Sequence, residues 1–141
     1  MRILRLLWAL PYTLVGLVVA GVARASGGTT QLRDGVVEAW GGPLKALPRL
    51  PLAGGIGAIT FGHVVLATHE KQMGWSRIHE RAHVRQYERW GLLFGPAYLL
   101  NALLIRLRGG DPYTDNRFER EAREAEAKAK KDGSPAKAGP G

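Results

Sequence analysis

The sequence predicts an α+β fold, and three observations along its 141 residues predict it. Residues 6–23 are uncharged and mostly aliphatic, as in a long apolar helix. Residues 36–40 and 56–68 are rich in β-branched and apolar side chains, which indicates a small antiparallel sheet. The chain after residue 74 has the patterns of three helices.

The N-terminal segment, residues 1–25, is predicted to be a transmembrane helix or signal-anchor. Its uncharged run is flanked by Arg2, Arg5 and Arg24. Eighteen residues of helix span about 27 Å, slightly less than the hydrocarbon core of about 30 Å, and arginines that reach the headgroups can make up the difference. We therefore expect a single-pass membrane protein, with the side of the following domain left open.

Two other interpretations of this segment remain open. Ala23-Arg24-Ala25 precedes Ser26 in the pattern of a signal-peptidase site, so residues 1–25 could be a cleaved signal. The same apolar run could also be a buried helix of a soluble domain.

The predicted strands follow this helix. Residues 26–30 contain only Gly, Ser and Thr and are predicted to be a linker. Residues 36–40 are predicted to form a strand that ends at Gly41. Residues 56–68 are predicted to form one longer strand, with a bulge at Gly62.

Three helices are predicted after the strands. The first runs from about residue 75 to 90, the second over the strongly apolar residues 97–107, and the third over residues 116–131, which are rich in Glu, Ala, Arg and Lys. The second helix is too short to span a bilayer and is expected in the core or at a membrane surface. Residues 33–131 are the predicted domain, and residues 132–141 a disordered tail.

The composition restricts the partners and the kinds of site. The chain has 20 Lys and Arg against 12 Asp and Glu, a net charge of +8. The positive charges are scattered and do not alternate with aromatic residues, so we expect an anionic membrane surface and no nucleic acid as the partner. The absence of cysteine excludes disulfides and thiolate ligands, so any metal must be bound by histidines and carboxylates.

The second half of the chain contains an HExxH motif at residues 79–83. On a helix, His79 and His83 lie one turn apart on the same face and can bind one metal ion. Glu80 can then take a proton from water bound to that metal. The alternative is an exposed charged helix with two unrelated histidines.

A catalytic zinc site needs a third protein ligand, and the candidates are His63, His69, Glu119 and Glu121. We favour Glu119, in the first turn of a helix that can return to the His pair. Its spacing from Asn116 equally fits a capping box, in which Glu119 would bind the Asn116 amide.

The other candidates have simpler explanations. His63 is expected to be a strand histidine near the cleft, and Glu121 points to a different face of its helix from Glu119. His69 begins an incomplete copy of the motif, because Met73 stands where the second histidine would be, and it is expected in a loop. Gln86 lies one turn after His83, where it can bind a ligand or stand on the surface.

The residues around the motif resemble the gluzincin class of zinc metallopeptidases. HExxHxxQ at residues 79–86 and FExEA at residues 118–122 carry the resemblance. The most similar family is a small bacterial metallopeptidase-like domain found in proteins linked to toxins and contractile injection systems. Its Ala-x-Thr-x-Gly strand matches residues 58–62. The resemblance covers roughly residues 55 to 126.

The resemblance implies a zinc ion bound by His79, His83 and Glu119, with Glu80 as the catalytic base. One position departs from the family, because Arg123 stands where an Asp normally supports the histidines. The sequence offers three carboxylates as substitutes: Glu38, Asp111 and Asp115.

The expected function is therefore a membrane-anchored zinc metallopeptidase that hydrolyses a peptide or protein substrate. His63, Tyr98 and Tyr113 are candidate hydrogen-bond donors to the reacting carbonyl oxygen. Two alternatives remain: a catalytically silent, membrane-tethered scaffold or partner-binding domain, and a basic protein that binds nucleic acid or anionic lipid.

Overall fold

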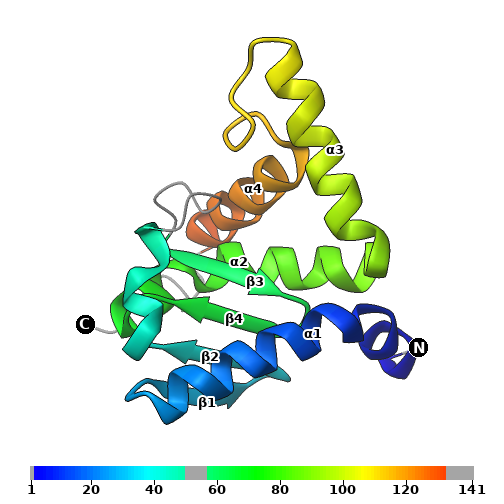
Figure 1. The fold of residues 1–141 in the computed structure, drawn as a ribbon. Helices are drawn as coiled ribbons and strands as arrows, with labels where there is room; N and C mark the ends of the chain where they lie inside the picture. Colours follow the sequence, from blue (N-terminus) through cyan, green and yellow to red (C-terminus); the bar gives the residue numbers. More distant parts are fainter. Residues whose placement is uncertain (1, 50–56, 133–141) are drawn as a thin grey trace.

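A four-stranded sheet lies between two long helices in the computed structural model, which describes residues 2–49 and 57–132 (Figure 1). Helix α1 (Arg2–Ala25) lies along one face of the sheet, and helix α2 (Glu70–Trp90) along the other. The α+β class is confirmed. The predicted tail, apart from its first residue, lies outside the described residues.

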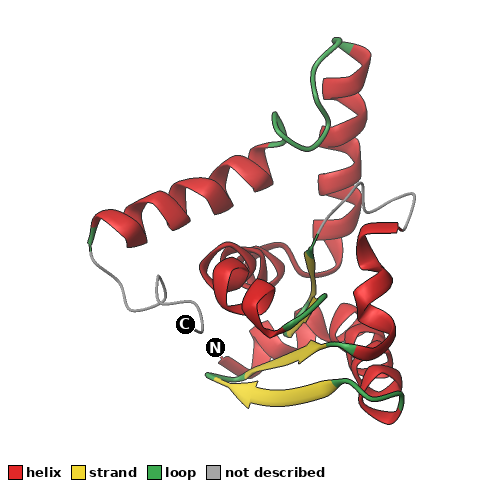
Figure 2. Cartoon of the chain, turned by 90° about the vertical axis from the view of Figure 1, so that its left-hand side faces the viewer, coloured by secondary structure: helices red, strands yellow, loops and turns green. Residues whose placement is uncertain are grey.

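Helices α3 (Phe94–Leu107) and α4 (Arg117–Lys131) follow α2, so the three predicted helices are all present. A 3-10 turn, η2 (Gly91–Leu93), joins α2 to α3. Figure 2 shows α3 and α4 diverging from the loop that connects them. This arrangement brings the first turn of α4 back to α2.

Helix α2 begins five residues earlier than the predicted start at residue 75. His69 is its N-cap, and its Nδ1 accepts a hydrogen bond of 3.0 Å from the backbone N–H of Gln72. The prediction that His69 lies in a loop missed this cap, because an imidazole nitrogen can satisfy a free N–H of the first helical turn much as Ser or Asp does.

The sheet is mixed, whereas the sequence predicted an antiparallel one. Its strands lie in the order β1-β2-β4-β3, with bounds β1 Thr29–Arg33, β2 Val36–Trp40, β3 Ala58–Phe61 and β4 Val64–Ala67. The β1–β2 and β3–β4 pairs are antiparallel, but β2 and β4 are parallel. The parallel pair arises because the chain leaves β2 through a 3-10 helix, η1 (Gly42–Arg49), and adds β3 at the outer edge.

Two predictions about the strands were wrong. Residues 56–68, whose first residue lies outside the described range, form a hairpin of two strands because Gly62 turns the chain at φ 60°. The predicted linker at residues 26–30 overlaps β1, which pairs with β2 through a tight turn at Asp34 and Gly35. Both turn residues have positive φ, of 52° and 78°.

The central strand β4 is buried on both faces, because its side chains alternate between the two helices. Val64 and Leu66 pack in a cluster with alanines of α1, and Val65 and Ala67 pack in a cluster with Met73 of α2. An uninterrupted apolar run is the expected sequence of a strand covered on both sides.

Helix α1 contacts the sheet through small residues. Ala9, Gly16, Ala20 and Ala23 are buried. A Cβ on Gly16 would lie 2.6 Å from the Cβ of Val64, so only glycine permits this close approach. The sheet and α1 therefore share one core.

The opposite face of α1 is apolar and exposed. Its exposed large side chains are Ile3, Leu4, Leu6, Leu7, Trp8, Leu10, Leu14, Val15, Leu17, Val18 and Val22. Among the described residues, two helical stretches are long and apolar enough to cross a membrane. They are α1 and Glu70–Leu107, which runs through α2, η2 and α3. Length and apolarity are shared by spanning helices, signal sequences and core helices.

A buried glutamate joins the sheet to α2. The Glu38 side chain on β2 is 1% exposed. It accepts hydrogen bonds of 2.9 and 3.1 Å from Arg77 and of 2.6 Å from Gln31, and Arg81 lies 3.3 Å away. Burial alone would raise the pKa of Glu38, but the hydrogen bonds and positive charges of these neighbours hold it below 4.5.

We expect Glu38→Gln to lower the free energy of unfolding by about 3 kcal/mol at pH 7, because it leaves two partly buried arginines without their anion. Because the pKa of Glu38 is lowered in the folded protein, its charge stabilises the fold at pH values above 4.5, the ordinary pKa. The difference in unfolding free energy between wild type and variant should therefore shrink as the pH falls below 4.5. Urea unfolding between pH 3 and 7 measures both effects. Glu124→Gln, at an exposed position of α4, is the control, and an equal loss in both variants would contradict this role of Glu38.

Candidate metal centre

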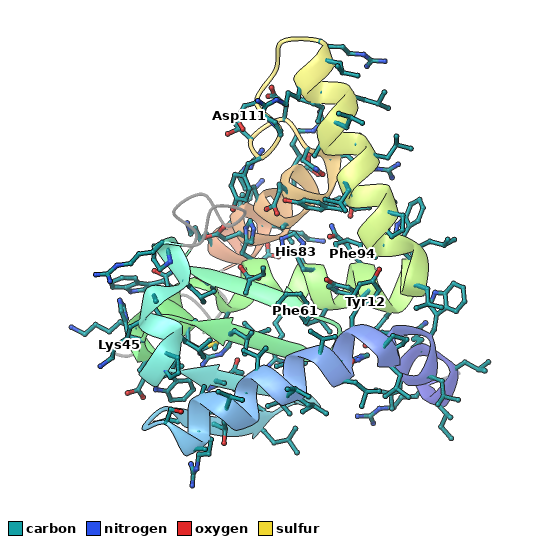
Figure 3. The ribbon with its side chains drawn as sticks, in the orientation of Figure 1. Tyr12, Lys45, Phe61, His83, Phe94 and Asp111 are labelled. Carbon is teal, nitrogen blue, oxygen red and sulfur yellow. The ribbon has the colours of Figure 1, made fainter. Side chains whose placement is uncertain are left out.

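The side chains of His79, His83 and Glu119 converge between α2 and α4. His79 Nε2 lies 2.9 Å from one Glu119 oxygen. His83 Nε2 lies 3.2 and 3.3 Å from the two oxygens of the same carboxylate. Figure 3 shows His83 on the side of α2 that faces α3 and α4.

This cluster could hold a metal ion. One ligand atom from each residue lies within 4.8 Å of the others, and His83 and Glu119 are buried. Two imidazoles and a carboxylate are a donor set that suits zinc and other divalent transition metals. The three residues predicted to be ligands are therefore brought together.

The capping alternative for Glu119 is wrong. Asn116 caps α4 by itself, since its Oδ1 accepts a hydrogen bond of 3.0 Å from the Phe118 N–H. The Glu119 carboxylate instead points away from the cap and contacts the two histidines and the Tyr98 hydroxyl, at 2.9 Å.

Gln86 determines how His83 presents its ring. The Gln86 amide donates to the Phe118 carbonyl at 2.9 Å and to Glu121 at 2.8 Å, so its own oxygen faces His83 Nδ1 at 2.8 Å. An oxygen at that position requires a proton on Nδ1, which leaves the Nε2 lone pair for a metal. This orientation is the usual outer support of a metal-binding histidine.

His79 has a carboxylate behind its ring as well. A Glu126 oxygen lies 3.6 Å from His79 Nδ1, on the opposite side of the ring from Glu119. Glu126 comes one helical turn after the position where the resembled family has Asp. Arg123, which occupies that position, points to the Thr114 carbonyl.

None of the three predicted substitutes supports the histidines. Glu38 binds Arg77 and Arg81, on the sheet side of α2. Asp111 and Asp115 hold the loop before α4, in which Asp111 accepts hydrogen bonds from two backbone amides and Asp115 accepts one. Figure 3 shows Asp111 far from His83.

The remaining candidate ligands lie elsewhere. His63 sits in the β3–β4 turn, where its Nε2 is 2.9 Å from Glu88, and His69 caps α2. Glu121 accepts from Gln86 and is 3.7 Å from Arg89. Of the carboxylates considered as the third ligand, only Glu119 faces the histidine pair.

Glu80 lies beside this cluster and is 6% exposed. Its Oε2 accepts a hydrogen bond of 2.6 Å from Thr60 on β3. Burial raises the pKa of Glu80, while His83, Thr60 and His79 counteract this effect. A buried carboxylate with a raised pKa and a positioned hydroxyl partner can act as a general base.

The electrostatics of the cluster are those of an anion between two bases. Burial alone would lower the pKa of His83, but the carboxylates of Glu119 and Glu80 raise it to about 9. Burial would raise the pKa of Glu119, yet the two histidines hold it far below its usual range. A proton on His83 thus occupies the place that a cation would take.

Aromatic packing positions the first turn of α4. Phe118 is buried and packs against Trp90 and Phe94, with ring centroids 5.6 and 5.2 Å apart. Phe94 also lies 6.4 Å from the His83 ring. Because Phe118 precedes Glu119, this contact sets where the carboxylate points.

Sequence reasoning missed Thr60 and Glu126, and it assigned Tyr98 only a general donor role. Thr60 could have been found from the strand pattern of the resembled family, in which it is the fixed threonine. Nothing in the local sequence marks Glu126, because it lies among similar glutamates of a charged helix.

No protein-family model, curated protein or solved structure compared with the chain matches it. What the site does is therefore argued from its own geometry and chemistry.

We expect the protein to bind one divalent metal ion, with zinc as the probe, and Glu119→Gln or His83→Ala to weaken binding far more than Gln86→Leu does. Loss of an outer partner such as Gln86 typically costs about 10–100-fold in metal affinity, whereas loss of a direct ligand removes a coordinating bond. Competition with a zinc-binding dye measures the dissociation constants.

Glu124→Gln is the matched control, because it changes an exposed glutamate of the same helix that has no contact with the histidines or with Gln86. Equal losses in Glu119→Gln and Glu124→Gln would show that Glu119 is not a ligand. Circular dichroism of each variant separates loss of metal from loss of fold.

Proposed function

We propose that the protein is a membrane-associated zinc metallopeptidase. The observation that carries the proposal is the convergence of His79, His83 and Glu119 next to the buried Glu80. This combination of two imidazoles, one carboxylate and an adjacent base is what metal-assisted hydrolysis of a peptide bond requires.

The donor atoms in this proposal are the Nε2 atoms of the two histidines and the carboxylate of Glu119. A zinc ion at this position would polarise the substrate carbonyl and acidify a water molecule. Gln86 and Glu126 support the assignment, because each faces the Nδ1 atom of one histidine and so favours a free Nε2 lone pair.

Glu80 is the general base in this mechanism. It takes a proton from the attacking water and delivers it to the leaving amine as the C–N bond breaks. Thr60 is a positioning residue, since its hydroxyl donates a hydrogen bond of 2.6 Å to one Glu80 oxygen and so restrains the carboxylate.

We propose that the substrate is an extended peptide that pairs with β3. This strand is at the edge of the sheet and carries Thr60, the partner of Glu80. A backbone added along β3 would run past the metal cluster, and main-chain pairing of this kind tolerates many sequences.

Tyr113 is the best-placed donor to the reacting carbonyl oxygen among the three predicted. His63 is bound to Glu88 away from the cluster, and the Tyr98 hydroxyl already donates to Glu119. Burial and the Glu119 and Glu80 carboxylates raise the pKa of Tyr113 to about 12, which supports a position near the cluster, and the residue is 42% exposed, so a substrate can reach it.

We propose that α1 associates with the membrane along its exposed face. The predicted single-pass topology would require α1 to leave the sheet, which would expose the close contact of Gly16 with Val64. Binding through Leu14, Val18 and their exposed neighbours keeps this packing and places apolar side chains in lipid.

We expect Glu80→Gln to keep zinc affinity within a few-fold and to reduce kcat for a cleaved peptide by about 10²–10⁴-fold, because the base is lost while the ligands remain. A library of fluorogenic peptides identifies the substrate, and the rate follows from its fluorescence. Glu124→Gln is the control. A zinc-loaded wild type that cleaves no peptide would favour the silent scaffold.

We expect the protein to sediment with membranes and to be released by alkaline carbonate, as peripheral proteins are. Leu14→Glu with Val18→Glu should shift it to the soluble fraction, because both residues are exposed and a charge there opposes burial in lipid. Leu32→Glu, at an exposed position of β1, should not. Resistance to carbonate would instead indicate a spanning helix.

A further inference from the structure

A cavity of about 460 Å³ lies between the first turns of α1, the β1–β2 turn and α2. Four arginines line it: Arg2 and Arg5 from α1, and Arg81 and Arg85 from α2. We refer to it as the arginine cavity. It contains none of the three metal-cluster residues.

The arginine cavity has more positive charge than its own carboxylates neutralise. Two acids line it, Asp34 and Glu88, and Glu88 is bound to His63 at 2.9 Å. Within residues 2–49 and 57–132, no carboxylate lies within 4.0 Å of the guanidinium groups of Arg2, Arg5 or Arg85.

Arg81 adds a hydrogen-bond donor that is not satisfied. One of its terminal nitrogens donates to the Arg33 carbonyl at 2.7 Å and lies 3.3 Å from Glu38. Its Nε is buried and has no hydrogen-bond partner among the described residues. Because this N–H is enclosed by protein atoms, Arg81 contributes positive charge to the cavity wall, and the free guanidinium donors are those of Arg2, Arg5 and Arg85.

The turn at the edge of the cavity leaves room for Arg2. A Cβ on Gly35 would lie 3.4 Å from an Arg2 terminal nitrogen, at a φ of 78° that suits glycine. The tight turn therefore holds the chain close to the first residues of α1 without a side chain that would fill the space.

We propose that the arginine cavity binds the phosphate group of an anionic phospholipid headgroup. Guanidinium groups match phosphate with paired N–H donors, and several of them around one cavity favour a doubly coordinated anion. The neighbours of Arg2 and Arg5 along α1 are exposed and apolar: Ile3, Leu4 and Leu7 are 71%, 62% and 58% exposed.

Because arginines and exposed apolar residues alternate along the first turns of α1, a phosphate site and a lipid-facing surface lie on the same turns. A phosphate in the cavity would lie at headgroup level while these apolar side chains enter the acyl region. Free phosphate shares the chemistry of the headgroup but makes no use of the apolar side chains.

The arginine cavity is independent of the proposed peptidase site. Arg81 is two residues from both His79 and His83, which corresponds to about 200° around a helix, so it faces away from them. Zinc affinity should therefore be unaffected by changes in the cavity, and failure of one proposal does not entail failure of the other.

The test compares the full-length protein with Arg5→Gln/Arg85→Gln and with the matched control Arg24→Gln/Arg120→Gln, which removes the same charge from exposed positions elsewhere. Binding is measured to vesicles of phosphatidylcholine with and without about 30 mol% phosphatidylglycerol, and to inorganic phosphate by calorimetry. Zinc affinity and thermal unfolding report whether each variant is folded.

We expect phosphatidylglycerol to tighten vesicle binding of the wild type and the control at least about tenfold, and the cavity variant to lose most of this gain. Saturable binding of inorganic phosphate that depends on Arg5 and Arg85, without a preference for phosphatidylglycerol, would support the phosphate site and identify free phosphate as its source.

Equal loss of binding in the two double variants would overturn the proposal, because net charge alone would then explain it. The absence of binding to both vesicles and phosphate would also overturn it. Binding of a single-stranded oligonucleotide that requires Arg5 and Arg85, without binding of vesicles or phosphate, would overturn the proposal as well.

Discussion

The shared carboxylate of Glu119 between two imidazoles is the interaction that organises this protein. It connects α2 to α4 across 40 residues of sequence, and the intervening α3 contributes the hydroxyl of Tyr98 to the same carboxylate. An anion so deeply placed is stable only because protonated or metal-bound nitrogens surround it. The aromatic contacts of Phe118 keep it there.

Helix α2 performs different tasks on different faces. One face holds His79 and His83 against α4, and another inserts Arg77 next to the buried Glu38 of β2. The sheet contact matters for the site as well, since Thr60 on β3 holds Glu80. The packing that stabilises the fold therefore also orients the general base of the proposed mechanism.

Helix α1 contributes to the fold and to the proposed location at the same time. Its small residues permit close contact with β4, and most of its large apolar residues face outward, although Tyr12 and Val19 pack inward. A helix of this kind gives the domain a continuous apolar surface. The proposed phosphate site at its N-terminal end would place the same domain at a defined depth in the interface.

The amino-acid sequence by itself determined the α+β class, the helix with the His pair and the apolar first helix, because helical and strand periodicities are local. It could not determine whether Glu119 caps α4 or faces the histidines, since both uses have the same spacing. Only the tertiary structure decided this, by packing Phe118 against Trp90 and Phe94. The parallel β2–β4 pair and Glu126 behind His79 likewise depend on contacts between distant segments, which no local pattern records.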